Sequence, residues 1–341
     1  MLDQALGFLS HELAIDLGSA NTLIYMRGKG IVVEEPSVVA VERPRSGTRV
    51  LAFGVEAKRM VGRTPEHITA IRPVREGAIH DFPLAESLLH ACLERALGGR
   101  SFVRPRVIAA VPHGTNEVQR RAVADSARSA GCREVTLIDG LIAAGLGCDL
   151  PVQEPIGSLV VNIGAGTTEV GVISLGGVAA STTLTLAGDD IDAAIAQWVR
   201  EKHNLLVGER TAEEIKLAVG CARPPPERRA IQITGRDLRE GIPREITLTS
   251  DEISQAVQPP LKRIIEAIQQ TLSRTAPELA ADIYEHGMIL CGGTALLPDL
   301  NRMLSDVTGL PVIVAADPIR CVALGAGRLL TTDNLLERAS I

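Results

Sequence analysis

Residues 14–24 read AIDLGSANTLI, and residues 160–170, which lie 146 positions further on, read VVNIGAGTTEV. Each segment joins an apolar run to a Gly/Ser/Thr turn and then to a second apolar run, with Gly18 matching Gly164 and Thr22 matching Thr168. Such a pattern is typical of two strands joined by a tight turn. Its recurrence predicts an internal duplication of the chain.

A second correspondence supports this duplication. The first half continues with a predicted strand, helix and strand over Arg106–Val111, Asn116–Ala130 and Val135–Ile138. The second half repeats that order over Met288–Cys291, residues 297–307 and Val312–Val314. Each half therefore combines a β-meander with a βαβ unit, which predicts an α/β fold with helices covering mixed sheets.

The two turns also point to a ligand. Glycine-rich turns let backbone N–H groups approach phosphate oxygens closely. Short polar donors accompany them: Ser19, Asn21, Thr22, Thr167 and Thr168. Either turn alone would be read as a structural hairpin, but a facing pair would hold a polyphosphate from both sides. Asp16 would then hold Mg²⁺, directly or through water.

Two further segments would suit a ligand-binding cleft between the two turns. Residues 288–295, MILCGGTA, predict a strand that ends in a Gly-Gly pair, where a base or ribose can lie on bare backbone. Thr211 and Glu214 predict a capping box that opens a helix. Glu213 and Lys216 share one face of that helix. The residues alone favour a solvent-exposed ion pair there and leave a ribose contact open.

The amino-acid composition excludes some classes of function. The chain has 35 Lys+Arg against 41 Asp+Glu, a formal net charge of −6. Proteins that coat nucleic acids usually show a basic footprint, so no nucleic-acid partner is predicted. The six cysteines are at least 16 residues apart, which excludes the spacing of a zinc clip. Scattered reduced thiols of a cytoplasmic protein are expected.

Membrane contact is predicted to be peripheral, because no apolar run approaches the ~20 residues of a spanning helix. Residues 1–13, MLDQALGFLSHEL, form an apolar stripe at helical spacing. Leu2, Leu6, Leu9 and Leu13 form the stripe, and Met1, Ala5 and Phe8 lie beside it. The stripe predicts either a short interfacial helix or a helix packed on its own domain. No Lys or Arg precedes Arg27, so little attraction to anionic lipid is expected.

Segments along nearly the whole chain resemble the MreB family of bacterial actin homologues. They are IDLGSANTLIY at 15–25, EPSVVA at 35–40, GRTP at 62–65, AIRP at 70–73, GTTEV at 166–170, VISL at 172–175, PELA at 277–280 and Asp282-Ile283. The resemblance implies an actin-like fold, which is a duplicated ribonuclease H-like α/β architecture. In it, two domains with mixed sheets and smaller inserted subdomains surround a nucleotide cleft.

The resemblance also implies how the chain is divided. The first core subdomain comprises residues 1–32, 77–150 and 318–341, with 33–76 as its small insert. The second core subdomain comprises residues 151–186 and 249–317, with 187–248 as its small insert.

ATP and Mg²⁺ are the ligands that the resemblance implies, with Asp16 as the metal ligand, either directly or through water. The implied nucleotide contacts are Asp16, Gly18, Ser19, Ala20, Asn21, Asn162, Gly164, Ala165, Gly166, Thr167, Glu213, Glu214, Ile215, Lys216, Gly292, Gly293, Thr294 and Ala295. The resemblance therefore changes the prediction for Glu213 and Lys216, which are now expected to contact the nucleotide instead of forming a surface ion pair.

The family forms membrane-associated double filaments that organise cell-wall synthesis and rod shape. The resemblance therefore implies self-association, a cytoplasmic location on the inner face of the cell membrane, and wall-synthesis and shape-determining membrane proteins as partners. The residues expected to meet the membrane are Met1, Leu2, Leu6, Phe8 and Leu9, together with Phe102 and Val103.

Two departures from the family pattern concern hydrolysis. Asn162 stands where the family has the Asp of Asp-Ile-Gly-Gly-Gly-Thr, and an amide cannot act as a base. Asp139-Gly140-Leu141 replaces Glu-Glu-Pro, so Gly140 stands where a Glu would orient the attacking water. Asp139 lies one position early and is a weak catalytic candidate, because small displacements cost much rate. We therefore predict nucleotide binding with slow or absent hydrolysis.

Two other functions stay open at this point. A small-molecule kinase of the same superfamily needs a carboxylate base, for which Asp16 and Asp139 are the acidic candidates in suitable turns. An accessory paralogue would no longer polymerise and would serve as a scaffold. Whether the chain is an ATPase is left open.

Overall fold

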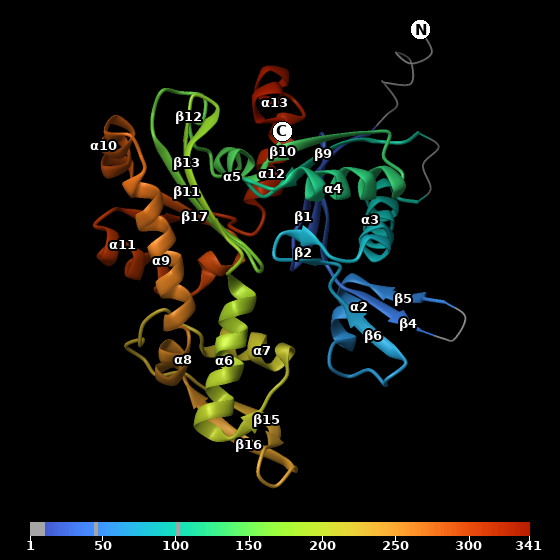
Figure 1. The fold of residues 1–341 in the computed structure, drawn as a ribbon, viewed down its shortest axis with the longest axis vertical. Helices are drawn as coiled ribbons and strands as arrows, with labels where there is room; N and C mark the ends of the chain where they lie inside the picture. Colours follow the sequence, from blue (N-terminus) through green and yellow to red (C-terminus); the bar gives the residue numbers. More distant parts are fainter. Residues whose placement is uncertain (1–10, 44–46, 100–102) are drawn as a thin grey trace.

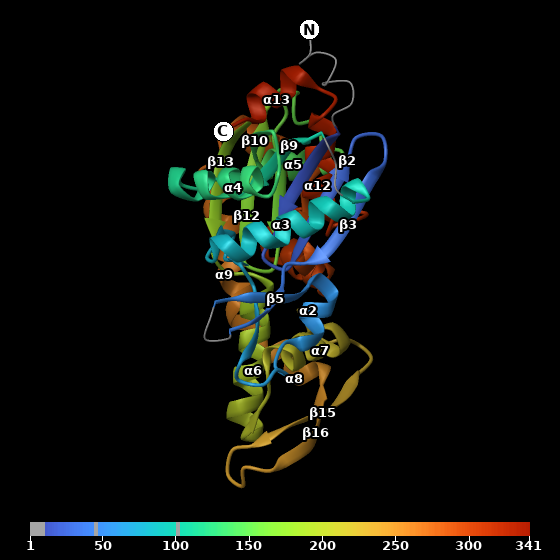
Figure 2. The same cartoon turned by 90° about the vertical axis from the view of Figure 1, so that its right-hand side faces the viewer.

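The computed structural model describes residues 11–43, 47–99 and 103–341. Two five-stranded sheets form its framework, and each has a three-stranded sheet beyond it. The large sheets stand side by side in the upper part of Figure 1, and both small sheets lie below them. Figure 2 shows the second small sheet, with β15 and β16, at the far end of the molecule.

The first large sheet has the strand order β10-β9-β1-β2-β3. Its strands are β1 (Glu12–Leu17), β2 (Asn21–Met26), β3 (Gly30–Pro36), β9 (Arg106–Val111) and β10 (Glu134–Asp139). β1 is antiparallel to β2 and parallel to β9. Leu13 and Ile15 pack under α3 (Phe82–Leu97) and α4 (Glu117–Ser129), while Ala14 faces a different core. Burial on both faces explains why β1 is an almost continuous apolar run.

The second large sheet repeats this topology in the order β13-β12-β11-β17-β18. Its strands are β11 (Ser158–Ile163), β12 (Thr168–Ser174), β13 (Gly177–Leu184), β17 (Met288–Cys291) and β18 (Val312–Val314). β11 is antiparallel to β12 and parallel to β17, as β1 is to β2 and β9. The predicted duplication, the mixed sheets and the strand pairs of each βαβ unit are confirmed.

Helices of the second half cover its sheet and share one large core with it. They are α9 (Gln258–Ser273), α10 (Pro277–His286), the 3₁₀ turn η1 (Gly293–Leu296) and α11 (Leu300–Thr308). The helix predicted at 297–307 therefore begins three residues later, because the chain first makes η1. The two prolines after Gln258 occupy the first turn of α9, where a missing N–H leaves no gap in the hydrogen bonding.

Two helices pack between the large sheets at unusually short range, α5 (Gly140–Gly147) and α12 (Cys321–Leu329). A Cβ atom on Gly147 would lie 1.8 Å from the carbonyl oxygen of Cys321. One on Gly325 would lie 1.7 Å from that of Ala143. Only glycine allows this contact, so the two backbones touch directly at the centre of the molecule.

The small sheets are built from short strands and their helices. The first contains β4 (Val39–Glu42), β5 (Arg49–Phe53) and β6 (Ile68–Ile71), with α2 (Gly54–Met60). The second contains β14 (Leu205–Leu206), β15 (Ala230–Asp237) and β16 (Pro243–Thr249), near α6 (Gly188–His203), α7 (Glu209–Val219) and α8 (Ser250–Ala256). The remaining elements are β7 (Val74–Arg75), β8 (Ala78–Ile79) and α13 (Asp333–Ala339).

The predicted start of α7 is corrected. α7 begins at Glu209 with Gly208 as its N-cap, so Thr211 lies inside the helix and the predicted capping box with Glu214 is wrong. A capping box does open α8, where the Thr249 side chain and Glu252 satisfy each other's backbone N–H groups.

The predicted apolar stripe at the N-terminus does not reach Leu13, which is a fully buried residue of β1. Met1, Leu2, Leu6, Phe8, Leu9 and Phe102 lie outside the described residues, while Val103 is partly buried. In the described ranges, no helix combines the length and the apolar character needed to cross a bilayer.

Candidate functional site

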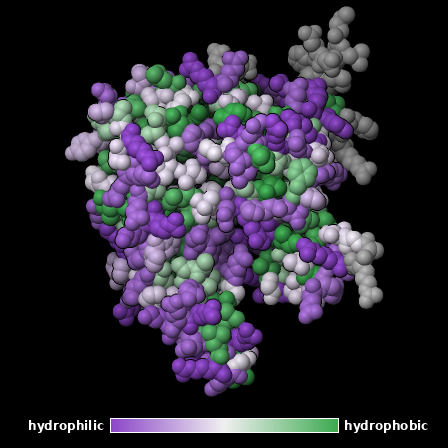
Figure 3. Space-filling model, viewed as in Figure 1, coloured by the Kyte–Doolittle hydropathy of each residue, from purple (hydrophilic) through white to green (hydrophobic). Residues whose placement is uncertain are grey.

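A cavity of roughly 410 Å³ lies between the two halves of the chain. Its walls come from the β1–β2 and β11–β12 turns, the starts of α5 and α6, α7, and the loops after β17 and before α12. Figure 3 shows a hollow between the two lower lobes of the molecule. The predicted contacts that line the cavity are Asp16, Gly18, Ser19, Ala20, Asn21, Asn162, Gly164, Ala165, Gly166, Thr167, Glu213, Lys216, Gly292, Gly293 and Thr294.

Three predicted contacts lie away from the cavity. Glu214 is exposed and its carboxylate accepts a hydrogen bond from Arg210. Ile215 and Ala295 are buried in the core of the second half. On a helix, only residues three or four apart share a face, which explains why α7 presents positions 213 and 216 to the cavity and turns 214 and 215 away.

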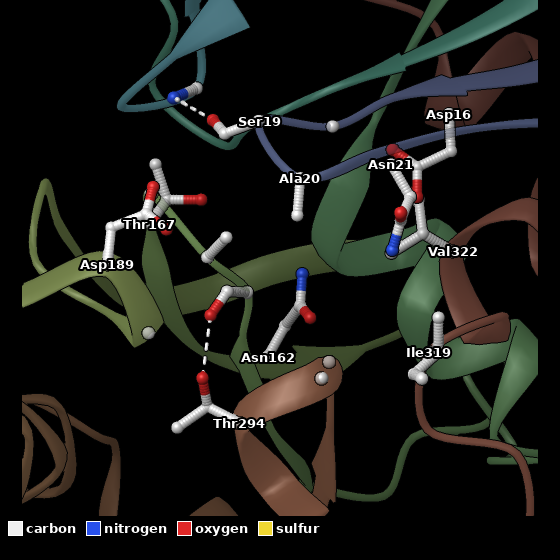
Figure 4. Close-up of a pocket in the computed structure, with 18 of the residues that line it drawn as sticks. Asp16, Ser19, Ala20, Asn21, Asn162, Thr167, Asp189, Thr294, Ile319 and Val322 are labelled. Carbon is white, nitrogen blue, oxygen red and sulfur yellow. Dashed lines mark hydrogen bonds between the residues drawn. The ribbon is translucent and has the colours of Figure 1, made fainter. Parts of the chain in front are cut away.

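Hydrogen bonds fix the first turn, between β1 and β2, from two sides. Gly18 N donates to Asn21 O at 3.0 Å, and a Cβ on Gly18 would lie 2.8 Å from that same oxygen. Ser19 Oγ accepts a hydrogen bond from Gly77 N at 3.2 Å, shown dashed in Figure 4. The turn is therefore fixed both by its own backbone and by the β7–β8 hairpin.

The second turn closes in the same way and faces the first. Gly164 N donates to Thr167 O at 2.9 Å. A Cβ on Gly166 would lie 2.7 Å from Ser19 Oγ, so glycine is needed where the turns approach each other. Ala20 and Asn162 point toward one another across the cavity (Figure 4).

Several backbone donors at these turns are free within the described chain. The N–H groups of Ser19, Ala20, Ala165 and Gly166 donate to no described residue. Successive unpartnered N–H groups in tight turns form a concave site for an anion.

A buried ion pair anchors α7 to α6 beside these turns. Lys216 Nζ donates to Asp192 Oδ2 at 2.8 Å and to Gly188 O at 3.0 Å. The other oxygen, Asp192 Oδ1, is buried and has no hydrogen-bond partner among the described residues. Burial raises the pKa of Asp192 to about 6 although Lys216 lowers it. Asp192 thus lines the cavity as a residue, while this oxygen itself is closed off from it.

The opposite wall is apolar. Leu217, Leu296, Leu297 and Pro298 line it from α7 and from the segment that follows Gly293, while Ile319 and Val322 close it near α12. Thr294 Oγ1 donates to Gly164 O at 2.8 Å and joins this segment to the second turn (Figure 4). A Cβ on Gly293 would meet nothing within 4 Å, so open space lies beside its backbone. A flat apolar ring fits such a wall.

A chain of hydrogen bonds lies at the other end of the cavity. Asn162 Nδ2 donates to Glu169 Oε2 at 3.1 Å, and His113 N donates to Glu169 Oε1 at 2.7 Å. Burial raises the pKa of Glu169 to about 7, although both donors lower it. Both oxygens of this carboxylate are thus engaged by protein donors.

Asp139 does not line the cavity. One of its oxygens accepts from Leu141 N at 2.9 Å and caps α5, and the other lies 2.5 Å from His113 Nδ1. The hydrogen bond with Asp139 raises the pKa of His113. Both carboxylate oxygens of Asp139 therefore contact protein groups, and its suggested catalytic role stays a prediction.

Asp16 is the carboxylate nearest to the first turn and lies beside Asn21 in Figure 4. Burial raises its pKa to about 7. Within the described ranges, no three His, Cys, Asp or Glu side chains are grouped as a metal site. A single carboxylate is still compatible with Mg²⁺, which usually takes one or two carboxylates with phosphate oxygens and water.

Residues that the sequence did not single out complete the site. Arg72, Asp189, Asp192 and Glu169 all line the cavity. Arg72 lies in a family-like segment, and three aspartates at 189–192 follow Gly188. Only the folded chain reveals their place, because their partners are distant in the sequence.

A family model described as MreB/Mbl protein matches residues 10–338. The cell shape-determining protein MreB of Escherichia coli (strain K12) is 50% identical over 334 residues, which cover 97% of this chain and 96% of the relative. The cell shape-determining protein Mbl of Bacillus subtilis (strain 168) is 41% identical over 332 residues, which cover 97% and 99%.

Solved structures of family members are also similar to this chain. MreB5 of Spiroplasma citri bound to ADP is similar with a TM-score of 0.90 and 32% identity, covering 95% of this chain and 97% of that one. The AMPPNP-bound form gives a TM-score of 0.91 over the same shares. The MamK double helical filament shares the fold, with a TM-score of 0.77 at 19% identity over 94% and 99% of the two chains. The chain has the actin-like fold and belongs to the MreB/Mbl family.

Proposed function

We propose that this chain binds ATP with Mg²⁺ in the cavity and assembles with further copies into filaments on the inner face of the cell membrane. These filaments would act on cell shape through cell-wall synthesis. One observation carries the proposal: the two duplicated turns face each other across a single cavity, with Gly166 against Ser19. The names of the relatives and the nucleotides bound to MreB5 support it.

The cavity fits a nucleoside triphosphate part by part. The free N–H groups of both turns suit phosphate oxygens. Glu213 in the wall of the cavity suits a ribose hydroxyl, and the apolar wall beside Gly293 suits a base. Each part of the ligand thus meets a complementary group, and the phosphates are held without a basic surface.

Asp16 is the residue that would hold Mg²⁺. Its carboxylate lies at the cavity beside Asn21, and burial raises its pKa to about 7. When bound, Mg²⁺ supplies positive charge that neutralises the phosphates.

We further propose that hydrolysis is slow. Asn162 is an amide whose Nδ2 is engaged by Glu169, Gly140 has no side chain, and Asp139 is engaged by His113 and Leu141. The cavity therefore lacks a free carboxylate where the family carries one to orient water. The chain would hold ATP for long periods and remain in its triphosphate-bound state.

Electron microscopy of the full chain with Mg-ATP and lipid vesicles tests the proposal, with fluorescent-nucleotide titration beside it. Double filaments on vesicles and saturable nucleotide binding are expected. Nucleotide-bound monomers that never assemble would overturn the filament proposal and favour a scaffold. ADP release that depends on an added sugar would favour a kinase instead.

A further inference from the structure

The hairpin formed by β7 and β8 touches both turns of the cavity. Its two-residue loop is Glu76-Gly77, and both residues have a positive φ, 50° and 72°. Positive φ at both positions is the conformation of a type I′ turn, which joins two strands tightly. Gly77 N donates to Ser19 Oγ in the first turn at 3.2 Å. A Cβ on Gly166 in the second turn would lie 2.7 Å from Glu76 N, so the hairpin lies against both turns.

Arg72, which precedes this hairpin, connects it to the second half of the chain. Its Nη1 donates to Asp189 Oδ1 at 3.0 Å, and its Nη2 lies 2.8 Å from Glu209 Oε1. The side chain of Arg72 is 19% exposed, whereas those of its partners are 39% and 55% exposed. A guanidinium can bind two separate carboxylates at once, because its N–H donors form a rigid fork. Arg72 therefore joins the starts of α6 and α7 to the first half.

Asp189 is itself bonded to the second turn. Its backbone N–H donates to Ala165 O at 2.8 Å, while its carboxylate is held by Arg72. Arg72 and Gly77 belong to one short segment of the chain. This segment is therefore linked to the second turn through Asp189 at one end and is bonded to the first turn at the other end.

Arg72 differs in this respect from Lys216 and Lys58. Within the part of the chain that the structure describes, Arg72 and Lys216 are the two cations that line the cavity. Lys216 donates to residues of α6, which belongs to the same half as α7. Lys58 reaches across the cavity to Glu213, whose carboxylate is not bonded to either turn in the described chain. The ion pair of Arg72 with Asp189 is thus the connection between the halves that acts on a turn.

The hairpin lies on the side of the cavity away from the apolar wall. In Figure 4, Ser19, Thr167 and Asp189 lie on one side of the cavity, and Ile319 and Val322 lie on the other. A base bound against the apolar wall would therefore direct its phosphates toward the hairpin. The last phosphate of a triphosphate would come closest to the point where the two turns approach each other, and a diphosphate would end short of it.

We propose that Arg72 is a positioning residue that holds the two turns at the spacing a terminal phosphate needs, and that it thereby makes the site prefer a nucleoside triphosphate to a diphosphate. This inference rests on the proposed function and names the part of that ligand which the segment recognises. N–H···O hydrogen bonds keep donor–acceptor distances of ~2.7–3.2 Å. A small outward displacement of the second turn therefore removes contacts to a phosphate that both turns share.

Titration of the full-length chain with fluorescent analogues of ATP and ADP, in the presence of Mg²⁺, tests the proposal. The readout is the ratio of the two dissociation constants, which a general loss of stability would not change. Arg72→Met should lower the preference for ATP by at least about five-fold, the effect of losing about one hydrogen bond. Arg72→Lys keeps the charge but bonds one carboxylate at a time, so an intermediate ratio is expected.

Three further variants separate this role from other roles of the same side chains. Arg75→Met removes an exposed arginine from the same hairpin and should leave both constants unchanged. Lys58→Met removes an ion pair that is not bonded to a turn, so it should weaken ATP and ADP binding alike and leave the ratio unchanged. Asp189→Asn breaks the ion pair from the other side and should lower the ratio as Arg72→Met does, with no further loss in the double variant.

An unchanged ratio in both Arg72→Met and Asp189→Asn would overturn the proposal, and so would an equal loss of affinity for the two nucleotides. Amide hydrogen exchange of the nucleotide-free chain gives a readout that needs no ligand. The peptide that contains Asp189 should exchange faster in Arg72→Met than in Arg75→Met, because the start of α6 is no longer held to the hairpin. Equal exchange would overturn the positioning role. Failure of the unchanged chain to bind either nucleotide would instead overturn the proposed function, while faster exchange in Arg72→Met would still support the positioning contact.

Discussion

Lys58 Nζ donates to Glu213 Oε1 at 2.8 Å, although 155 residues separate them. Lys58 belongs to α2 beside the first small sheet, and Glu213 belongs to α7 beside the second. Arg72 repeats the connection, with Nη1 at 3.0 Å from Asp189 Oδ1 and Nη2 at 2.8 Å from Glu209 Oε1. Ion pairs therefore join the two halves of the chain across the cavity.

Loss of the Lys58 pair should speed nucleotide release. Both side chains are partly exposed, so the pair is worth ~0.2–1 kcal/mol, which corresponds to an increase of up to about five-fold in the dissociation rate. Stopped-flow displacement of a fluorescent ATP analogue from Lys58→Met measures this rate. Arg59→Met is the control, since Arg59 is an exposed cation on the same helix. Equal rates in the two variants would show that the pair does not hold the cleft closed.

Asn162→Asp should raise the rate of ATP hydrolysis. The change restores a carboxylate at the second turn, and positioned acid–base groups contribute ~10²–10⁴-fold. Because other family groups are missing, about ten-fold is expected. Single-turnover phosphate release measures it. Asn116→Asp, the same change at the N-cap of α4, is the matched control. If Asn162→Asp hydrolyses no faster than this control, Asn162 is not what limits the reaction.

The companion change Gly140→Glu carries a steric penalty in this chain. A Cβ at this position would lie 2.9 Å from Val111 O, so the start of α5 must shift to admit any side chain. The double variant with Asn162→Asp should therefore hydrolyse faster than either single change but lose thermal stability. A stable double variant with the rate of the unchanged chain would contradict the proposed reason for slow hydrolysis.

The sequence predicted the framework well because that framework depends on local patterns. Strands β9 and β17 have the predicted bounds, and the repeated turns meet as their duplication implied. Contacts between distant segments were not predictable. Asp192 becomes a site residue only through Lys216, and α5 touches α12 only because Gly147 and Gly325 carry no side chain. The predicted start of α7 was wrong because Thr211 is a residue type that favours the N-cap position. In the folded chain Gly208 is the N-cap residue of α7.

Gly325→Ala should destabilise the chain strongly. The new Cβ would lie 1.7 Å from Ala143 O, and the contact is with backbone, which cannot rotate away. Overpacking in a well-packed core costs ~1–3 kcal/mol or more. Urea unfolding followed by circular dichroism measures the loss. Gly208→Ala adds the same atom in open space and should change stability little. Similar losses in both variants would argue against a tight α5–α12 contact.

Membrane binding should depend weakly on salt. The predicted membrane residues are apolar, and the chain has a net charge of −6. Attraction to anionic lipid is therefore small, and apolar contact is not screened by ions. Vesicle sedimentation at low and high salt measures this, with Leu6→Glu as the variant expected to reduce binding. A steep fall with added salt would contradict the apolar anchor.

Stability without nucleotide should fall as pH rises from about 4.5 to 7, partly because of Glu169. Burial raises the pKa of this carboxyl from 4.5 to about 7 in the folded chain. In that window the folded state binds more protons than the unfolded state, so unfolding becomes easier with increasing pH. The shift corresponds to a contribution on the order of 3 kcal/mol. Asp16 and Asp192 act in the same direction.

Glu169→Gln isolates this contribution, because it removes the titration and keeps the shape. Urea unfolding at pH 5 and pH 7.5 should show a smaller loss of stability in this variant than in the unchanged chain. Glu154→Gln, which alters an exposed carboxylate, should keep the full loss. His113 also loses stabilisation as pH rises, because its pKa is raised by Asp139, but its window begins near pH 6.5. Equal losses in all three chains would show that Glu169 ionises freely in the folded state.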